Sequence, residues 1–373
     1  MANHYEDSLK EKILGYLGKL NTDKNTYEYS PVLNSLTAQG KELKLGFSCL
    51  ALKCYFMLGA WETLDIKKQK EWIHYINTFQ GSVTNLPANS YVDRAFVNHY
   101  NLYKSRFGIK NVAKYSMNII YPGKYSTNNQ KYEETIRAET KQAIATVFEV
   151  GYRNKFEYIE FPKEGSNINQ YLDSLNWNNP WTSGAQFSSL CVFSRTQLSD
   201  SESKKTALYL YDYLEKVLNS ENGLYYIGNQ DNKNELINGA MKVITGLDWL
   251  DLPIHYPEKI IDFCLSSKPN QEGCDIVDII YVLYKCVNHT NYKRKIIQQY
   301  LEDLKPLIKQ HFKEAEGGFS YFTENCQQYY YGIQFSNKNN QADIHGTTLL
   351  LWALSMIEEI SDLDKRRFKV IKP

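Results

Sequence analysis

From about residue 150 onward, one pattern recurs along the chain. Each unit opens with an aromatic-rich turn marked by glycine, as at Gly223, Gly273 and Gly317, and passes through a polar loop. It then enters an apolar helix through a polar first turn, and an amphipathic helix returns. Apolar helices are buried on all sides, whereas amphipathic helices show one face to water. The alternation therefore predicts two concentric layers of helices.

Helical hairpins of this kind can close on themselves or form an open solenoid. In a closed α/α toroid, the N-termini of the inner helices meet at one mouth and offer backbone N–H groups and a partial positive charge. An open solenoid needs no polar inner mouths, so the polar first turns favour an all-α fold, an α/α toroid (barrel) with inner and outer layers. We expect a single domain over residues 1–373, with the clearest repeats over residues 131–373 and a weaker hairpin pattern over residues 1–130.

Helical periodicity also predicts where the individual helices lie. The expected helices outside the apolar repeats cover residues 5–20, 42–59, 67–79, 89–103, 133–151, 204–218, 257–265 and 292–312. Residues 115–132 are rich in Pro, Gly and Asn and are expected to form a long connection.

Composition excludes several classes of protein. The 43 basic and 42 acidic residues leave a net charge of +1, whereas nucleic-acid or anionic-membrane binding needs a basic excess. The seven cysteines are scattered without a CxxC pair, so we expect reduced core residues. The N-terminus lacks the apolar core of a secretory signal, and no apolar stretch is long enough for a transmembrane segment. The expectation is a cytoplasmic protein.

Asp343 and His345 stand out because they precede an almost wholly apolar helix over residues 349–357. A carboxylate and an imidazole at a cavity mouth can act as general acid and base, or as metal ligands. The alternative is that Asp343 is the N-cap of the helix and His345 an ordinary first-turn residue. We expect the pair to carry acid–base catalysis.

Asp275 and Asp278 lie three residues apart, on one helical face. They are candidates for assisting carboxylates, or simply for first-turn acids that complement the helix dipole. Trp181 is a candidate to stack on a sugar ring, and Gln186 and Asn238 are candidates to bind hydroxyl groups. Each of these three residues also has a purely structural interpretation.

Aromatic residues make up 14% of the chain, including 30 tyrosines, many of them clustered between helices. Aromatic rings with polar tips suit walls that contact sugars or stabilise cations, although ordinary amphipathic packing also uses them. The candidate tyrosines for the wall of a site are Tyr225, Tyr226, Tyr321 and Tyr330.

Common cofactor and hydrolase motifs are absent. The sequence has no GxGxxG after a strand, no Walker A loop, no GxSxG elbow and no HExxH helix. Its seven histidines are dispersed, so no His-rich metal site is expected. We therefore predict no cofactor and no metal.

Two family resemblances rest on these residues. The Gly317–Tyr321 opening followed by Asp343 and His345 at the head of an inner helix resembles repeats of the terpene cyclase and protein prenyltransferase superfamily. The prenyltransferases bind zinc through an Asp, a Cys and a His at inner-helix mouths, for which Asp275, Cys274 and His345 are the candidates here. The Asp-x-Cys spacing of that family and the Asp-x-Asp-Asp proton donor of the cyclases are absent.

The second resemblance is to toroidal sugar enzymes, especially glucuronyl C5-epimerases. It rests on Trp181-Thr-Ser with Gln186, on Asn238-Gly-Ala-Met and on Asp343-Ile-His345-Gly-Thr-Thr, and it covers the C-terminal half. It implies an epimerase, lyase or hydrolase that acts on a glycan or sugar conjugate, with a small-molecule or glycan partner and no nucleic acid. The alternatives are an isoprenoid-handling enzyme with a metal at Asp275 and His345, and a non-catalytic helical scaffold.

Overall fold

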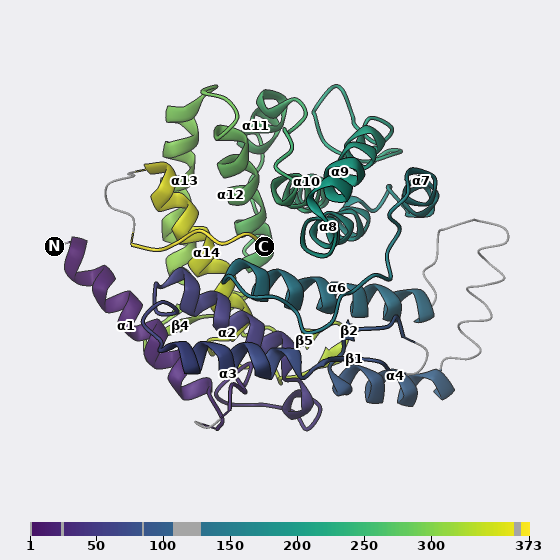
Figure 1. Ribbon diagram of the computed structural model, residues 1–373. Coiled ribbons are helices and arrows are strands. Elements are labelled where there is room, and N and C mark those ends of the chain that lie inside the picture. Colours follow the sequence, from purple (N-terminus) through teal and green to yellow (C-terminus); the bar gives the residue numbers. More distant parts are fainter. Residues whose placement is uncertain (1, 24–25, 84–85, 107–127, 362–366) are drawn as a thin grey trace.

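The computed structural model describes residues 2–23, 26–83, 86–106, 128–361 and 367–373 (Figure 1). Helices account for most of this part of the chain, and each of its strands is only two residues long. The prediction of an all-α fold is confirmed. None of the described helices is both long and apolar enough to cross a membrane.

An inner ring of helices organises the described chain. Each inner helix packs against the next in sequence order, and α14 returns to α2, so the ring is closed. In Figure 1 the yellow α14 meets the violet-blue α2 near the middle of the molecule. The predicted α/α toroid is therefore confirmed, and the open solenoid is not what forms. The inner helices are α2 (Leu45–Met57), α6 (Asn128–Glu149), α8 (Pro180–Gln197), α10 (Lys233–Trp249), α12 (Gly273–Val287) and α14 (Ile344–Ser361).

Outer helices cover this ring, and the two layers differ as the sequence pattern requires. The outer α13 buries only a stripe spaced three or four residues apart, Ile297, Leu301, Leu304 and Ile308. The inner α12 buries residues on every side. The remaining helices are α1 (Ala2–Leu20), α3 (Ile66–Asn77), α4 (Arg94–Arg106), α7 (Gly165–Asp173), α9 (Asp200–Leu214), α11 (Pro257–Leu265) and α13 (Arg294–Gln310).

Close packing between inner helices depends on small residues. A Cβ added to Gly184 of α8 would lie 2.9 Å from the carbonyl oxygen of Gly239 in α10. Only glycine leaves room for the two backbones to approach this closely. Since successive inner helices are joined through outer helices that run back, their N-terminal turns gather at one end of the ring, which we call the mouth.

Three antiparallel pairs of short strands lie between the helices. They are β1 (Gln80–Gly81) with β2 (Ser90–Tyr91), β3 (Phe312–Lys313) with β4 (Gly318–Phe319), and β5 (Tyr329–Tyr330) with β6 (Ile333–Gln334). The β5–β6 turn places Tyr331 and Gly332 at φ of 45° and 85°. Two successive residues with positive φ form a tight hairpin turn that matches the twist of the strands.

Some element boundaries differ from the sequence expectation. The helix expected over residues 89–103 starts only at Arg94, because Ser90 and Tyr91 pair with β1. The helix α7 was not anticipated. Most of the connection expected over residues 115–132 lies outside the described residues, and its end belongs to α6, which already begins at Asn128.

Candidate active site

Asp343 lies immediately before α14 and is completely buried. One carboxylate oxygen accepts hydrogen bonds from the backbone N–H groups of Tyr321 (2.7 Å) and Gln327 (3.0 Å). The other accepts from the N–H of Gly346 at 2.7 Å. Burial raises the pKa of Asp343 to about 6, against the opposing effect of these hydrogen bonds. The carboxylate thus caps α14 and ties the preceding loop to it; acid–base catalysis by Asp343 stays a prediction.

His345, in the first turn of α14, is held in a defined protonation state. Its Nδ1 lies 2.6 Å from Oε1 of Gln327, and its ring stacks on Tyr321 with centroids 5.6 Å apart. An amide oxygen only accepts, so Nδ1 carries the proton and Nε2 keeps its lone pair. Burial, aided by the positive charges of Lys242 and Lys53, lowers the pKa of His345 to about 4. At neutral pH the imidazole is therefore an uncharged base.

The two carboxylates of α12 differ in their surroundings. Asp275 accepts hydrogen bonds from the side-chain amides of Asn238 and Asn270, each at 2.7 Å. Asp278 is 2% exposed, and its Oδ2 has no hydrogen-bond partner among the described residues. Burial raises the pKa of Asp278 to about 7, although the charge of Lys242 opposes this. Asp275 is fixed in place, whereas Asp278 can exchange a proton near neutrality.

These side chains converge on one group, which we call the mouth cluster: Lys242, Cys274, Asp278, Tyr321 and His345. The charge of Lys242 acts on Asp278, on Cys274 and on His345. The Cys274 thiol also forms a hydrogen bond with the Tyr321 hydroxyl, and burial raises the pKa of both groups, so both keep their protons. The structure thus brings together four residues singled out from the sequence, Cys274, Asp278, Tyr321 and His345.

A second acidic group faces the mouth from α6. Glu139 is 1% exposed and accepts a hydrogen bond from the Tyr330 hydroxyl. Burial raises the pKa of Glu139 to about 8. Gly46, in α2, makes room for this pair, since an added Cβ would overlap the Tyr330 hydroxyl. The neighbouring Tyr331 packs against both Tyr330 and Phe96, with ring centroids 4.7 and 5.9 Å apart.

Gln186 and Trp181 lie on α8 near the mouth but make different contacts. The Gln186 Oε1 accepts from Arg137 Nη1 at 2.7 Å and from the Tyr171 hydroxyl at 3.1 Å, so its amide oxygen is already occupied. Trp181 is 44% exposed, and its backbone N–H donates to Glu235 Oε1 at 3.1 Å. The exposed indole stays a candidate platform for a sugar at the rim.

Tyr225 and Tyr226 are not part of the mouth cluster. The Tyr225 hydroxyl lies 3.2 Å from Nδ1 of His255, in the loop before the outer helix α11. The Tyr226 hydroxyl accepts hydrogen bonds from Asn219 (2.9 Å) and Asn222 (3.1 Å) within its own turn. Both tyrosines thus lie in the outer part of the fold. These contacts do not support a role in substrate binding, which stays a prediction.

Metal ligands do not gather in the described part of the chain. No group of three His, Cys, Asp or Glu side chains there is arranged to hold an ion. Both Asp275 oxygens accept hydrogen bonds from amides, as described above.

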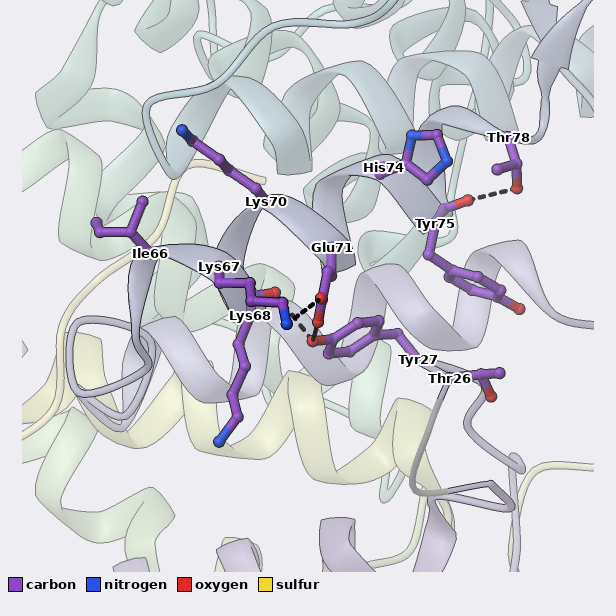
Figure 2. Close-up of a pocket in the computed structure, with 10 residues that line it drawn as sticks. All are labelled: Thr26, Tyr27, Ile66, Lys67, Lys68, Lys70, Glu71, His74, Tyr75 and Thr78. Atoms are coloured by element: carbon purple, nitrogen blue, oxygen red, sulfur yellow. Dashed lines mark hydrogen bonds and ion pairs between the residues drawn. The ribbon is translucent and has the colours of Figure 1, made fainter.

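A separate groove lies on the outer surface, along α3 (Figure 2). There the Tyr27 hydroxyl donates to the carbonyl oxygen of Lys68 at 3.0 Å and lies 3.4 Å from Glu71 Oε2. Its other lining residues include exposed lysines of α3 and His74. This groove belongs to the outer layer and shares no residue with the mouth cluster.

Comparison with known proteins gives few matches. No protein-family model and no curated protein matches the chain. Among solved structures, a polysaccharide lyase is 12% identical over 98% of this chain and 99% of its own, with a TM-score of 0.48. A GH76 alpha-mannanase from Bacteroides thetaiotaomicron is 9% identical over 96% of both chains (TM-score 0.42). A possible GH105 member from Salmonella enterica serovar Paratyphi A is 12% identical over 95% of this chain and 94% of its own (TM-score 0.44). Likenesses at this level carry no argument about function, which has to come from the side chains of the mouth.

Proposed function

We propose that this protein is a carbohydrate-active enzyme that binds a glycan or sugar conjugate at the mouth and acts on it by acid–base catalysis. The observation that carries the proposal is His345, an uncharged imidazole whose Nδ1 is fixed by Gln327 and whose Nε2 keeps its lone pair. A general base needs both properties, a free lone pair and a defined orientation. Aromatic faces beside it, Tyr321 in the cluster and Trp181 at the rim, suit a sugar ring.

The charges of the ring interior favour one reaction type over the others. Glycoside hydrolysis passes through an oxocarbenium-like transition state with positive charge on the sugar, and terpene cyclisation passes through carbocations. The ammonium groups of Lys242 and Lys53 act on His345 and would disfavour such charge. Removal of a proton from carbon creates negative charge instead, which these cations stabilise. The interior therefore supports epimerase or lyase chemistry.

In this reaction His345 Nε2 removes a proton from a sugar carbon next to an electron-withdrawing group. Asp278, in its protonated form, is the candidate acid. In an epimerase it would return a proton to the same carbon from the other face. In a lyase the electron pair would form a double bond and expel the neighbouring oxygen, which would take the proton. Asp343 holds α14 and Gln327 in position, and through Gln327 it orients His345.

Deuterium exchange tests the proposal directly. The full chain is incubated in D2O with oligosaccharides of uronic acids and, separately, with neutral oligosaccharides. Proton abstraction predicts incorporation of one deuterium per modified sugar, seen by mass spectrometry, or an unsaturated product seen by ultraviolet absorbance. Release of reducing sugar from neutral glycans without either signal would instead identify a hydrolase.

The pH dependence of turnover follows from the same two groups. His345 must be unprotonated to act as base, so activity rises as pH increases through its pKa of about 4. Asp278 must be protonated to act as acid, so activity falls as pH increases through its pKa of about 7. We therefore expect a bell-shaped profile of kcat/KM with its maximum between these values. The Asp278→Asn variant should lose the alkaline limb along with most activity, whereas a flat profile from pH 5 to 9 would contradict the assignment.

A further inference from the structure

Three lysines on different inner helices point into the ring: Lys53 of α2, Lys141 of α6 and Lys242 of α10. Each is only half-buried, although its sequence neighbours Leu52, Thr140 and Val243 are fully buried. The charges of Lys53 and Lys242 both act on Lys141 and, together with burial, lower its pKa. In the ring, α6 and α8 separate α2 from α10. Side chains that interact across this distance must be directed toward the axis of the ring.

Several half-buried lysines in the described part of the chain form ion pairs, which these three lysines do not. Lys285, also half-buried, forms an ion pair with Asp248 at 2.8 Å. In the part of the chain that the structure describes, no carboxylate lies within ion-pair distance of Lys53, Lys141 or Lys242. An ammonium group removed from bulk water without a counter-charge is unfavourable.

Two acidic residues, Glu149 and Asp278, act on these lysines electrostatically but do not form ion pairs with them. Glu149 acts on Lys53, but one of its oxygens accepts the backbone N–H of Lys372 at 3.1 Å. The charge of Lys242 acts on Asp278, but burial keeps a large part of this carboxyl protonated at neutral pH. Its Oδ2 has no hydrogen-bond partner among the described residues. A protonated carboxyl is itself a hydrogen-bond donor to an anion. The interior therefore combines cations and a donor, and no described carboxylate forms an ion pair with the three lysines.

We propose that Lys53, Lys141 and Lys242 form an anion-binding site in the ring interior, which receives a carboxylate or phosphate group of the substrate. The site adjoins the mouth cluster, because Lys242 belongs to both and the charges of Lys53 and Lys242 act on His345. This inference rests on the proposed function for its link to catalysis, because the anion would be held beside His345. Ammonium groups around a sugar carboxylate neutralise its negative charge and so make the neighbouring C–H bond more acidic.

Equilibrium binding tests the site without requiring turnover. Isothermal titration of the full chain at low salt would compare glucuronate and inorganic diphosphate, as the two sources of anionic charge, with glucose as the neutral control. We expect at least one of the anions to bind ten or more times more tightly than glucose. Binding should weaken as salt is added, because the contacts are between charges.

Variants separate an anion site from a structural role. Lys141→Gln should lower anion affinity at least tenfold and should leave the melting temperature unchanged or higher, since it removes a group whose charged form burial and the neighbouring lysines disfavour. Lys67→Gln, on the exposed face of α3, is the matched control and should change neither property. Equal binding of glucose and both anions, or unchanged anion binding by Lys141→Gln, would overturn the anion site.

The two proposals fail in different ways. If anions bind but deuterium exchange is absent with every glycan, the catalytic proposal falls and the anion site stands. If exchange occurs only on neutral sugars and no anion binds, the anion site falls and the catalytic proposal stands. Preference for diphosphate over glucuronate would identify a phosphorylated substrate as the source of the charge.

Discussion

The His345→Gln variant is expected to lose turnover by about 10²- to 10⁴-fold, the usual contribution of a general base. Glutamine has a similar reach and can still hydrogen-bond to Gln327, but it offers no basic nitrogen. The fold should therefore survive, with a melting temperature close to that of the wild type. Initial rates on the substrate found by deuterium exchange, together with a thermal melt, measure both properties.

A matched control makes this result specific. His74→Gln changes an exposed histidine of the outer helix α3 and should leave turnover unchanged. For a His345→Ala variant, added imidazole should restore part of the lost activity, because it supplies the missing base. Full activity in His345→Gln, or a loss explained by unfolding, would remove His345 from the mechanism.

The Asp343→Asn variant is expected to lower the free energy of unfolding by about 2–4 kcal/mol, because one or two buried N–H groups lose their acceptor. The carboxylate accepts three backbone hydrogen bonds with two oxygens, from Tyr321, Gln327 and Gly346. Asparagine keeps one oxygen and turns an NH₂ group toward the remaining donors. Chemical denaturation of the purified protein measures the change.

Asp65→Asn is the matched control for this effect. Asp65 caps the outer helix α3 by accepting from the N–H of Lys68 at 2.8 Å, but it is exposed to solvent. Water can replace the lost acceptor there, so the change in stability should be much smaller. If Asp343→Asn abolished turnover at unchanged stability, Asp343 would be a proton-transfer group, as the sequence led us to expect, and not mainly a cap.

Much of the fold could be predicted because the spacing of apolar residues shows whether a helix is buried on all sides or on one face. The amphipathic helix expected over residues 257–265 coincides with α11, and the apolar helices form the inner ring. The short strands were missed because two residues cannot show an alternating pattern. Helix α4 begins later than expected because Ser90 and Tyr91 pair with another strand, a tertiary contact that local sequence does not reveal.

The candidate site was predictable only in part. His345 and Asp278 were predicted because they are polar residues near the start of apolar helices, and Tyr321 because it belongs to the aromatic clusters between helices. The three lysines were missed, although a single lysine inside an apolar helix, such as Lys53 between Leu52 and Cys54, was the available signal. Tyr225 lies in a turn that resembles the others in sequence, but its hydroxyl contacts His255 in the loop before α11, so its role in the site stays a prediction.

The way in which α14 closes the ring has a consequence for synthesis of the chain. It packs against both α12 and α2, so one face of each of these helices stays uncovered until α14 has been made. Contacts between segments so far apart in sequence form slowly, and an incomplete ring leaves apolar helix faces open to aggregation or to chaperones. His345 is carried by this same helix. A chain that stops before α14 therefore lacks both the helix that closes the ring and the residue proposed as the base.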